Sequence, residues 1–301
     1  MINNRPLVTI MVIGGLFSAS SFAGPNNLDI TNLVDTQGNA NNNDFEGLAK
    51  ELSNVITSVN LAPAETPGLS GFDFALDYSF HDISEDQSYW KNSLTGRFEN
   101  RSPPIGLQTI GVKARKGFIL PIPQSTEIEL GATWVGDSNL WSLGGNLRLG
   151  LYEMGSFNTN YWMTWIPDIA ISAGGNRLVG TSQVDLVTLI GGLTASKNFA
   201  IAGDFSFAPF FSYHRIYLDA SSDTIDPDPS DPTDVDRNIV FDRLDLQEAW
   251  NTDQFAVRKT GGIRVIFGVV ELGLGYAVTE YEVGGIAKSM NHYNFRGGLN
   301  F

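Results

Sequence analysis

Apolar residues occupy every second position in long runs through most of this chain, and this alternation constrains the fold more than any other feature. Between Phe72 and Phe80, for example, every second residue is Phe, Leu or Tyr. Because neighbouring side chains of a β-strand point to opposite faces, each run predicts a strand with one apolar face. The runs are about as long as the ~9–11 residues of a tilted transmembrane strand, whereas ordinary strands have ~5–6.

A soluble β-sandwich or a lipocalin-like barrel, with its apolar faces turned inward, would alternate in the same way. Two further features favour a barrel with its apolar faces in lipid. The polar faces are rich in Gly and small residues, as a narrow lumen requires, and aromatic residues gather at the ends of the runs, as they do at membrane interfaces. These aromatic residues are Trp134, Trp141, Tyr152, Trp162, Trp165, Tyr217, Tyr281 and Tyr293. The predicted fold is all-β: a transmembrane, antiparallel, up-and-down β-barrel over residues 71–301.

Ten strands can be assigned, an even number as in single-chain bacterial barrels. If the C-terminus is periplasmic, the two longest connections, 81–104 and 219–256, both face the cell exterior, and short turns dominate the other side. An extra hairpin in 81–104 or 153–164 would give twelve strands. The predicted strands are 71–80, 105–117, 127–135, 141–152, 165–174, 184–196, 202–218, 257–267, 270–280 and 292–301.

Residues 1–23 have the pattern of a signal peptide: Arg5, then an apolar stretch, then Ser21-Phe22-Ala23 as a cleavage site. An N-terminal membrane anchor is the alternative, but the apolar stretch is shorter than the ~20 residues of a spanning helix. We therefore expect an exported protein of the bacterial outer membrane.

The composition narrows the classes of function. Asp and Glu number 33 against 19 Lys and Arg, and the net charge of −14 argues against a nucleic-acid partner. Because the chain has no Cys, disulfides, thiolate metal sites and cysteine nucleophiles are excluded. The sequence contains no phosphate-binding loop and no dinucleotide fingerprint.

Residues 24–70 precede the predicted barrel and begin with an Asn- and Asp-rich stretch. Apolar residues at helical spacing then predict a helix near 44–57, with Asp44 as its N-cap. We expect a periplasmic helix on the barrel rim in preference to a plug in the lumen, because the helix has a single apolar face. That face comprises Phe45, Leu48, Leu52, Val55 and Ile56.

The stretch Pro63-Ala64-Glu65-Thr66-Pro67-Gly68 resembles the start of the barrel in a group of uncharacterised bacterial outer-membrane proteins. Val112-Lys113-Ala114-Arg115-Lys116-Gly117, Ala195-Ser196-Lys197-Asn198-Phe199 and the closing residues 295–301 are similar too. The resemblance covers most of residues 45–301 and implies a ten-stranded barrel, but it implies no activity and no site residues. The long acidic stretch after the seventh predicted strand departs from that group.

Charged residues on the polar faces bear on function. If the apolar faces contact lipid, the lumen holds both signs, and ion pairs of Arg264 or Arg296 with Glu271 or Asp73 are expected. Such pairs can fill a narrow barrel or can set the ion preference of a pore, and the sequence favours neither. The candidate selectivity residues are Asp73, Asp77, Glu129, Arg148, Arg264, Glu271 and Arg296, with Glu127, Asp204 and Arg258 on the same faces.

Eleven acidic and two basic residues stand between Asp219 and Asp253. The centre of this stretch looks like a calcium loop, but Asp231 and Arg237 replace the Gly and the final Glu of an EF-hand. A solvated acidic loop is expected, and weak Ca²⁺ or Mg²⁺ binding that bridges the loop to anionic lipid headgroups is the alternative. The candidate ligands are Asp226, Asp228, Asp231, Asp234 and Asp236. No other cofactor is expected.

His81-Asp82 and Ser212-x-His214 are the best pairs for hydrolytic chemistry. That chemistry needs a nucleophile, a base and an orienting group within hydrogen-bond reach. We expect instead that His81, His214 and His292 lie at the girdle or the rim, and that the protein is not an enzyme.

The leading expectation for function is a narrow channel or uptake protein for small solutes, in which the lumen charges set selectivity. The alternative is a closed structural or surface-interaction barrel that acts through the acidic loop 219–256. The expected partners are outer-membrane lipid and lipopolysaccharide. The barrel assembly machinery is a further expected partner, through the C-terminal strand that ends in Phe301.

Overall fold

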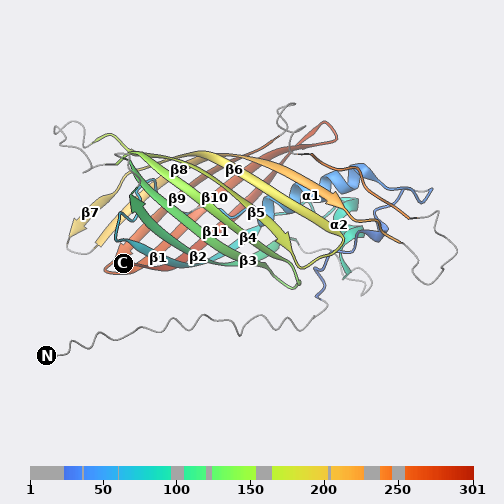
Figure 1. Ribbon diagram of the computed structural model, residues 1–301, viewed down its shortest axis with the longest axis horizontal. Helices are drawn as coiled ribbons and strands as arrows, with labels where there is room; N and C mark the ends of the chain where they lie inside the picture. The colour runs from blue at the N-terminus through green and yellow to red at the C-terminus, as the bar shows by residue number, and fades with distance from the viewer. Residues whose placement is uncertain are drawn as a thin grey trace.

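The computed structural model describes residues 24–35, 37–59, 61–95, 105–119, 124–153, 165–202, 205–226, 238–245 and 255–301. Ten long strands lie within these ranges: β1 (Phe72–His81), β2 (Leu107–Ile119), β3 (Ser125–Val135), β4 (Trp141–Tyr152), β5 (Asp168–Val179), β6 (Val184–Ser196), β8 (Phe205–Ser222), β9 (Ala256–Phe267), β10 (Val270–Val283) and β11 (Ile286–Asn300). Each pairs antiparallel with the next, and β1 pairs with β11, so the sheet closes into a barrel (Figure 1). The short β7 (Phe199–Ala202) pairs with the start of β8.

The closed, ten-stranded antiparallel barrel confirms the fold predicted from the alternation. Several strand boundaries differ from the prediction, and the largest differences are at the start of β11 and the end of β5. The predicted loop 281–291 is mostly a hairpin, because β10 and β11 continue to a tight turn at Gly284 and Gly285, whose φ angles are 55° and 78°. Glycine adopts these left-handed angles without strain. Strand β5 also continues beyond its predicted end, because Gly174 and Gly175, which suggest a strand end in the sequence, pair within the sheet.

The outside of the wall carries a belt of exposed apolar side chains. We call the end of the barrel where β1 starts and β11 finishes the C-terminal end, and the opposite end the distal end. Toward the distal end the outward-facing side chains become charged: Arg177 pairs with Asp185, and Lys259 with Glu280. The belt includes Phe72, Phe74, Leu76, Tyr78, Leu272, Leu274, Tyr276, Tyr293, Phe295 and Leu299.

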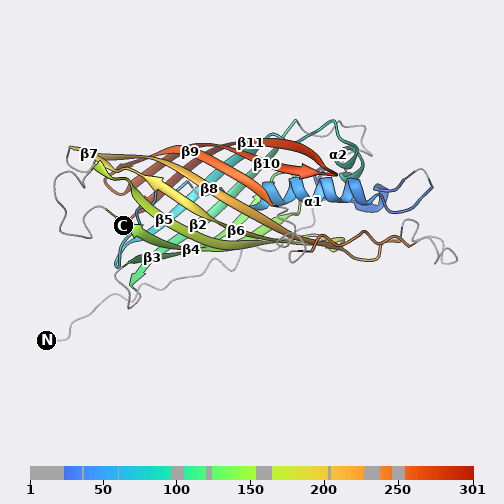
Figure 2. The same cartoon turned by 90° about the horizontal axis from the view of Figure 1, so that it is seen from above.

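Three short elements lie at the distal end, away from the C-terminus (Figures 1 and 2). They are η1 (Ile30–Asn32), α1 (Asn42–Ile56) and α2 (Ser88–Ser93). Helix α1 contacts β5, β6, β8 and β10, so it lies within the distal mouth of the barrel. The side chain of Asn41 accepts a hydrogen bond from the Asp44 amide, so Asn41 is the N-cap and the expected assignment to Asp44 was wrong. Within the described ranges, no helix is long and apolar enough to span a membrane.

The distal mouth is filled by an apolar core, which we call the distal core. The inward-facing residues at the distal ends of the strands are apolar and pack against α1, α2 and η1. Burial of this apolar surface stabilises the helix in the mouth. The distal core includes Ile30, Leu33, Phe45, Leu48, Leu52, Ile56, Trp90, Leu107, Val135, Leu178, Leu186, Leu218, Tyr281 and Met290.

The chain between α1 and β1 runs through the lumen. We call residues 57–59 and 61–70 the lumen segment. Strand β4 shows its direction, because three contacts follow one another along that strand. Ser142 near the distal end bonds the Ile56 carbonyl, Arg148 bonds the Pro63 carbonyl, and Glu153 just past the strand accepts from the Thr66 amide. The lumen segment therefore crosses the barrel from the distal end to the C-terminal end.

This course corrects the expected position of the N-terminal helix. Helix α1 lies in the mouth and continues into the lumen, so it is a plug and does not rest on the rim. Its polar residues Glu51 and Asn54 are buried as well as its apolar face, because partners surround the helix on several sides. Helix α1 and the C-terminus lie at opposite ends of the barrel (Figure 1).

Gly117 offers a test of the close fit between the lumen segment and the barrel wall. A Cβ at Gly117 would lie 1.9 Å from the carbonyl oxygen of Gly68 in the lumen segment. We expect Gly117→Ala to lower the free energy of unfolding by about 1–3 kcal/mol, the usual range for overpacking. Gly297→Ala is the control, because its Cβ would meet nothing within 4 Å. Urea unfolding followed by tryptophan fluorescence measures both, and equal stability of the two variants would contradict the close contact.

Candidate functional site

Buried ions from five neighbouring strands meet in the lumen toward the C-terminal end. Asp73 on β1 contacts Arg115 of β2 at 2.9 Å and Arg296 of β11 at 2.7 Å. Arg296 also donates from Nε to Glu271 of β10 at 2.8 Å, and Arg264 of β9 lies 3.7 Å from Glu271. All five side chains are buried. An unpaired charge in such a place is strongly destabilising, so each charge depends on its neighbours.

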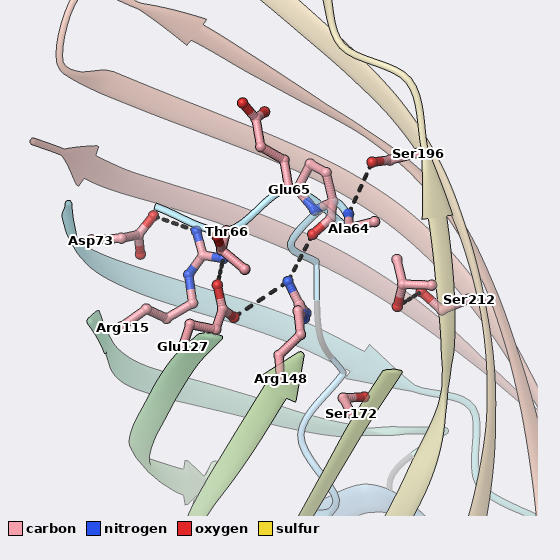
Figure 3. A network of polar contacts seen from close by, with 12 residues as sticks. Ala64, Glu65, Thr66, Asp73, Arg115, Glu127, Arg148, Ser172, Ser196 and Ser212 are labelled. Atoms are coloured by element: carbon pink, nitrogen blue, oxygen red, sulfur yellow. Dashed lines mark hydrogen bonds and ion pairs between the residues drawn. The ribbon is translucent and has the colours of Figure 1, made fainter. Parts of the chain in front are cut away.

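The network continues around the wall through Glu127. Arg115 and Arg148 approach this carboxylate at 3.5 and 3.3 Å. Figure 3 shows these groups in a row beneath the lumen segment, with Arg148 reaching the main chain there. The distance from Arg148 Nη1 to the Pro63 carbonyl oxygen is 2.7 Å. One guanidinium group thus bonds both the barrel wall and the segment that fills it.

Two more cations of the wall bind the lumen segment. Lys113 pairs with Asp77 at 2.6 Å and donates to the Val59 carbonyl at 2.9 Å. Arg264 lies 3.3 Å from the carboxylate of Glu65. The lumen charges and the lumen segment therefore form one connected polar network.

The structure places all the candidate selectivity residues on the lumen side and buries them. It brings Arg296 together with both Asp73 and Glu271, and Arg264 with Glu271. Asp204 lies outside the described residues. Whether any of these charges selects ions stays a prediction.

Sequence reasoning missed Lys113 and Arg115, which occupy central positions in the network. Their neighbours Val112 and Ala114 continue the outward face of β2, so the alternation itself assigns both cations to the lumen.

A water-sized cavity remains beside the lumen segment. Its volume is about 30 Å³, and its lining includes Lys113, Glu129, Asn146 and His214. One carboxylate oxygen of Glu129 has no hydrogen-bond partner among the described residues. A cavity of this size can hold water that satisfies such a group.

Arg258 of β9 holds the C-terminal end of α1. Its guanidinium donates to the carbonyl oxygens of Asn54 and Thr57, each at 2.6 Å, and to the Thr279 hydroxyl at 2.9 Å. The last carbonyls of a helix lack partners within the helix and carry partial negative charge. A buried cation at this point therefore stabilises the plug and fixes where the helix ends.

The histidines are buried in the lumen, so their expected place at the girdle or the rim was wrong. The Nδ1 atoms of His81 and His292 lie 2.7 Å apart, and the outer nitrogens contact Thr109 and Thr279. His214 contacts Ser172 at 3.3 Å.

The hydroxyl of Ser212 bonds Thr194 at 3.1 Å rather than His214. Ser212 and His214 thus do not form the hydrogen bond from nucleophile to base that this chemistry needs. Asp82 accepts a hydrogen bond from Asn291, while the ring nitrogens of His81 contact His292 and Thr109.

Glu51 on α1 is the centre of the distal core, and sequence reasoning missed it. It is fully buried and accepts hydrogen bonds from the Ser84 amide, the Trp90 indole and the hydroxyls of Tyr89 and Tyr281. Burial, together with the adjacent carboxylate, raises the pKa of the Tyr89 phenol, which keeps it a donor. Tyr281 was expected in an interfacial girdle, but it faces inward because this carboxylate is its partner.

The acidic stretch is described only in part. Asp226 lies within the described residues, whereas Asp228, Asp231, Asp234 and Asp236 lie outside them. Across the described ranges, no group of three or more His, Asp or Glu residues is placed to hold a metal ion. Asp219 at the base of the stretch bonds Arg243 at 2.9 Å.

Glu51 provides a stability test of the plug. In Glu51→Ala, three buried side-chain donors and one amide lose their acceptor, and each unpaired group costs about 1–3 kcal/mol. We expect a large loss of stability in Glu51→Ala and a smaller one in Glu51→Gln, which keeps one acceptor oxygen. Glu46→Ala on the same helix is the control, because it removes only a partly exposed pair with Lys50. Urea unfolding ranks the variants, and a Glu51→Ala protein as stable as Glu46→Ala would contradict this role.

The comparisons with known proteins show proteins of similar fold but no family. No protein-family model matches the chain, and no curated protein matches it. The similar solved structures include Ail of Yersinia pestis, with 8% identity over 77% of this chain and 99% of that one and a TM-score of 0.27. The translocator domain of the autotransporter NalP from Neisseria meningitidis shows 10% identity over 86% and 95%, with a TM-score of 0.37. Omp33 of Acinetobacter baumannii shows 10% identity over 77% and 99%, with a TM-score of 0.27.

Proposed function

We propose that this protein is a closed β-barrel of the bacterial outer membrane that presents a folded surface structure at its distal end. The observation that carries the proposal is the occupied lumen: the chain's own lumen segment bonds wall residues along the whole barrel. Of the two functions expected from the sequence, the geometry favours the structural or surface-interaction barrel over the narrow channel.

The space left in the lumen supports a closed state. Two cavities that the described residues line beside the lumen segment have volumes of about 30 and 10 Å³, enough for single waters rather than for a hydrated solute. An interior of ten strands is narrow before anything enters it, because barrels of about eight strands are filled by side chains. At the distal end, α1 and the distal core fill most of the opening and leave a pocket of about 340 Å³ between α1 and strands β8 to β10.

The outer surface supports a membrane location. Exposed aromatic and aliphatic side chains form the belt, and an exposed apolar area of that extent requires an apolar surrounding. Distal to the belt, ion pairs such as Lys259 with Glu280 stand on the outward face, where water and lipid headgroups would surround them. Lipid and lipopolysaccharide contacts at this boundary, and recognition of the C-terminal strand by the assembly machinery, belong to the same proposal.

The distal end also supports a role in surface interaction. The described parts of the acidic loop, 219–226 and 238–245, pair with each other through Ile225 and Ile239. Phe241 stacks on Phe45 of α1 with ring centroids 4.8 Å apart, and Asp242 bonds Asn42. The base of the loop is thus fixed to the plug. A fixed base positions the loop for contact with a partner at the surface.

Planar-bilayer recording of the refolded chain without residues 1–23 tests the closed lumen. We expect no discrete conductance steps from the chain without residues 1–23, because the lumen segment and α1 fill the passage. A variant that also lacks residues 24–66 should conduct, whereas one that lacks only residues 24–40 keeps both elements and should stay silent. Folding of each variant is checked by its heat-dependent shift on a gel. Discrete steps from the chain that lacks only residues 1–23 would contradict the proposal.

A further inference from the structure

The position of the N-terminal segment has a topological consequence. We call residues 24–35 and 37–56 the N-terminal cap. The cap lies at the distal end: Asn26 bonds the main chain of the β3–β4 turn, and Asn27 bonds Asn139 in the same turn. Strand β1 begins at the other end, and the lumen segment connects the two. A ring of ten paired strands surrounds that segment on all sides.

We infer that the barrel carries its own N-terminal cap across the outer membrane and holds it at the cell surface. The inference rests on the proposed outer-membrane location. A chain exported to the periplasm starts with its cap and its strands on the same side. Once β1 and β11 have paired, the ring encloses the lumen segment, and a cap that is still periplasmic at that stage reaches the distal side only by way of the lumen. The substrate of this translocation is an unfolded polypeptide, namely the segment that precedes the lumen segment.

The lumen segment has the form that such a passage requires. Thr66 is ten positions after Ile56, and the two residues contact Glu153 and Ser142, which are eleven positions apart along β4 and its end, so the segment is nearly as extended as a strand. Its main-chain carbonyls at Val59 and Pro63 bond cations of the wall. Contacts to main-chain atoms do not depend on the identity of the side chain, so successive residues of a passing chain can make them.

Contacts of the folded cap hold the lumen segment in its final position. An α-helix with its side chains is about 10–12 Å wide, so α1 forms after its residues have passed through the narrow lumen. In the mouth, Arg258 binds its last carbonyls and Glu51 binds donors from α2 and β10. These bonds, together with the distal core, prevent the segment from sliding back.

The direction follows from the asymmetry of the two ends. The C-terminal end has tight connections such as the turn at Gly268, while the distal end carries charged strand extensions, α2 and the base of the acidic loop. Outer-membrane barrels have short periplasmic turns and longer extracellular loops. The cap is therefore extracellular.

Cysteine labelling of whole cells tests the sidedness. The chain has no native Cys, so a single substitution gives one reactive thiol. Gln37→Cys places it on the exposed part of the cap, and Val269→Cys places it on the exposed turn between β9 and β10. We expect a membrane-impermeant maleimide to label Gln37→Cys on intact cells and Val269→Cys only after the outer membrane is permeabilised.

The other outcomes overturn the inference. Labelling of Gln37→Cys only after permeabilisation would place the cap in the periplasm. Labelling of both variants on intact cells would mean that the two ends do not lie on opposite sides. Neither result changes the bilayer recording, so an inverted barrel can be distinguished from an open one.

A second arm tests the route. A short unstructured epitope inserted before Gly24, flanked by two Cys residues, forms a disulfide-closed loop in the oxidising periplasm. The matched insertion carries Ser in place of both Cys. We expect antibody binding on intact cells for the Ser version and its loss for the Cys version, because a closed loop is two chains thick. Equal surface exposure of both versions would overturn passage through the lumen.

Discussion

The charges that line a narrow closed barrel need partners, and the rest of this structure depends on how that need is met. The inward faces of the strands carry arginines, lysine and carboxylates where solvent hardly reaches. Pairs across neighbouring strands neutralise most of them, but Lys113, Arg148 and Arg258 also bind main-chain carbonyls of the N-terminal region. Helix α1 and the lumen segment therefore supply acceptors that the wall lacks, and the wall cations determine where both of them lie.

Different interactions stabilise the two halves of the barrel interior. Toward the C-terminal end it is polar, and its stability comes from paired ions and hydrogen bonds. Toward the distal end it resembles the core of a soluble domain, in which α1 packs against apolar strand ends. Arg258 and Glu51 lie on either side of this boundary, one at the end of α1 and one within it. A barrel that serves only as a pore has no need of such a core, whereas a barrel that holds a structure at one end does.

The barrel could be predicted because alternation is a local property of each strand. The same alternation identifies the lumen charges, and it would have identified Lys113 and Arg115 had it been applied to β2. The place of α1 could not be predicted in this way. Its sequence shows one apolar face, and the partners that bury Glu51 and Asn54 come from distant parts of the chain, such as Tyr281. For the same reason the pairing of His81 with His292 depends on β1 and β11 meeting at the closure of the barrel.

A disulfide between the lumen segment and the wall tests most directly the central claim that the chain fills its own barrel. The hydroxyl oxygens of Thr57 and Thr188 are 3.0 Å apart inside the lumen. In a chain without native Cys, Thr57→Cys with Thr188→Cys should form a disulfide, whereas Thr57→Cys with Leu189→Cys should not, because Leu189 faces outward. Mass spectrometry of the linked peptides from cells reports the bond. Its formation in the first pair alone is the predicted result, and its absence there would show that the segment does not occupy the lumen.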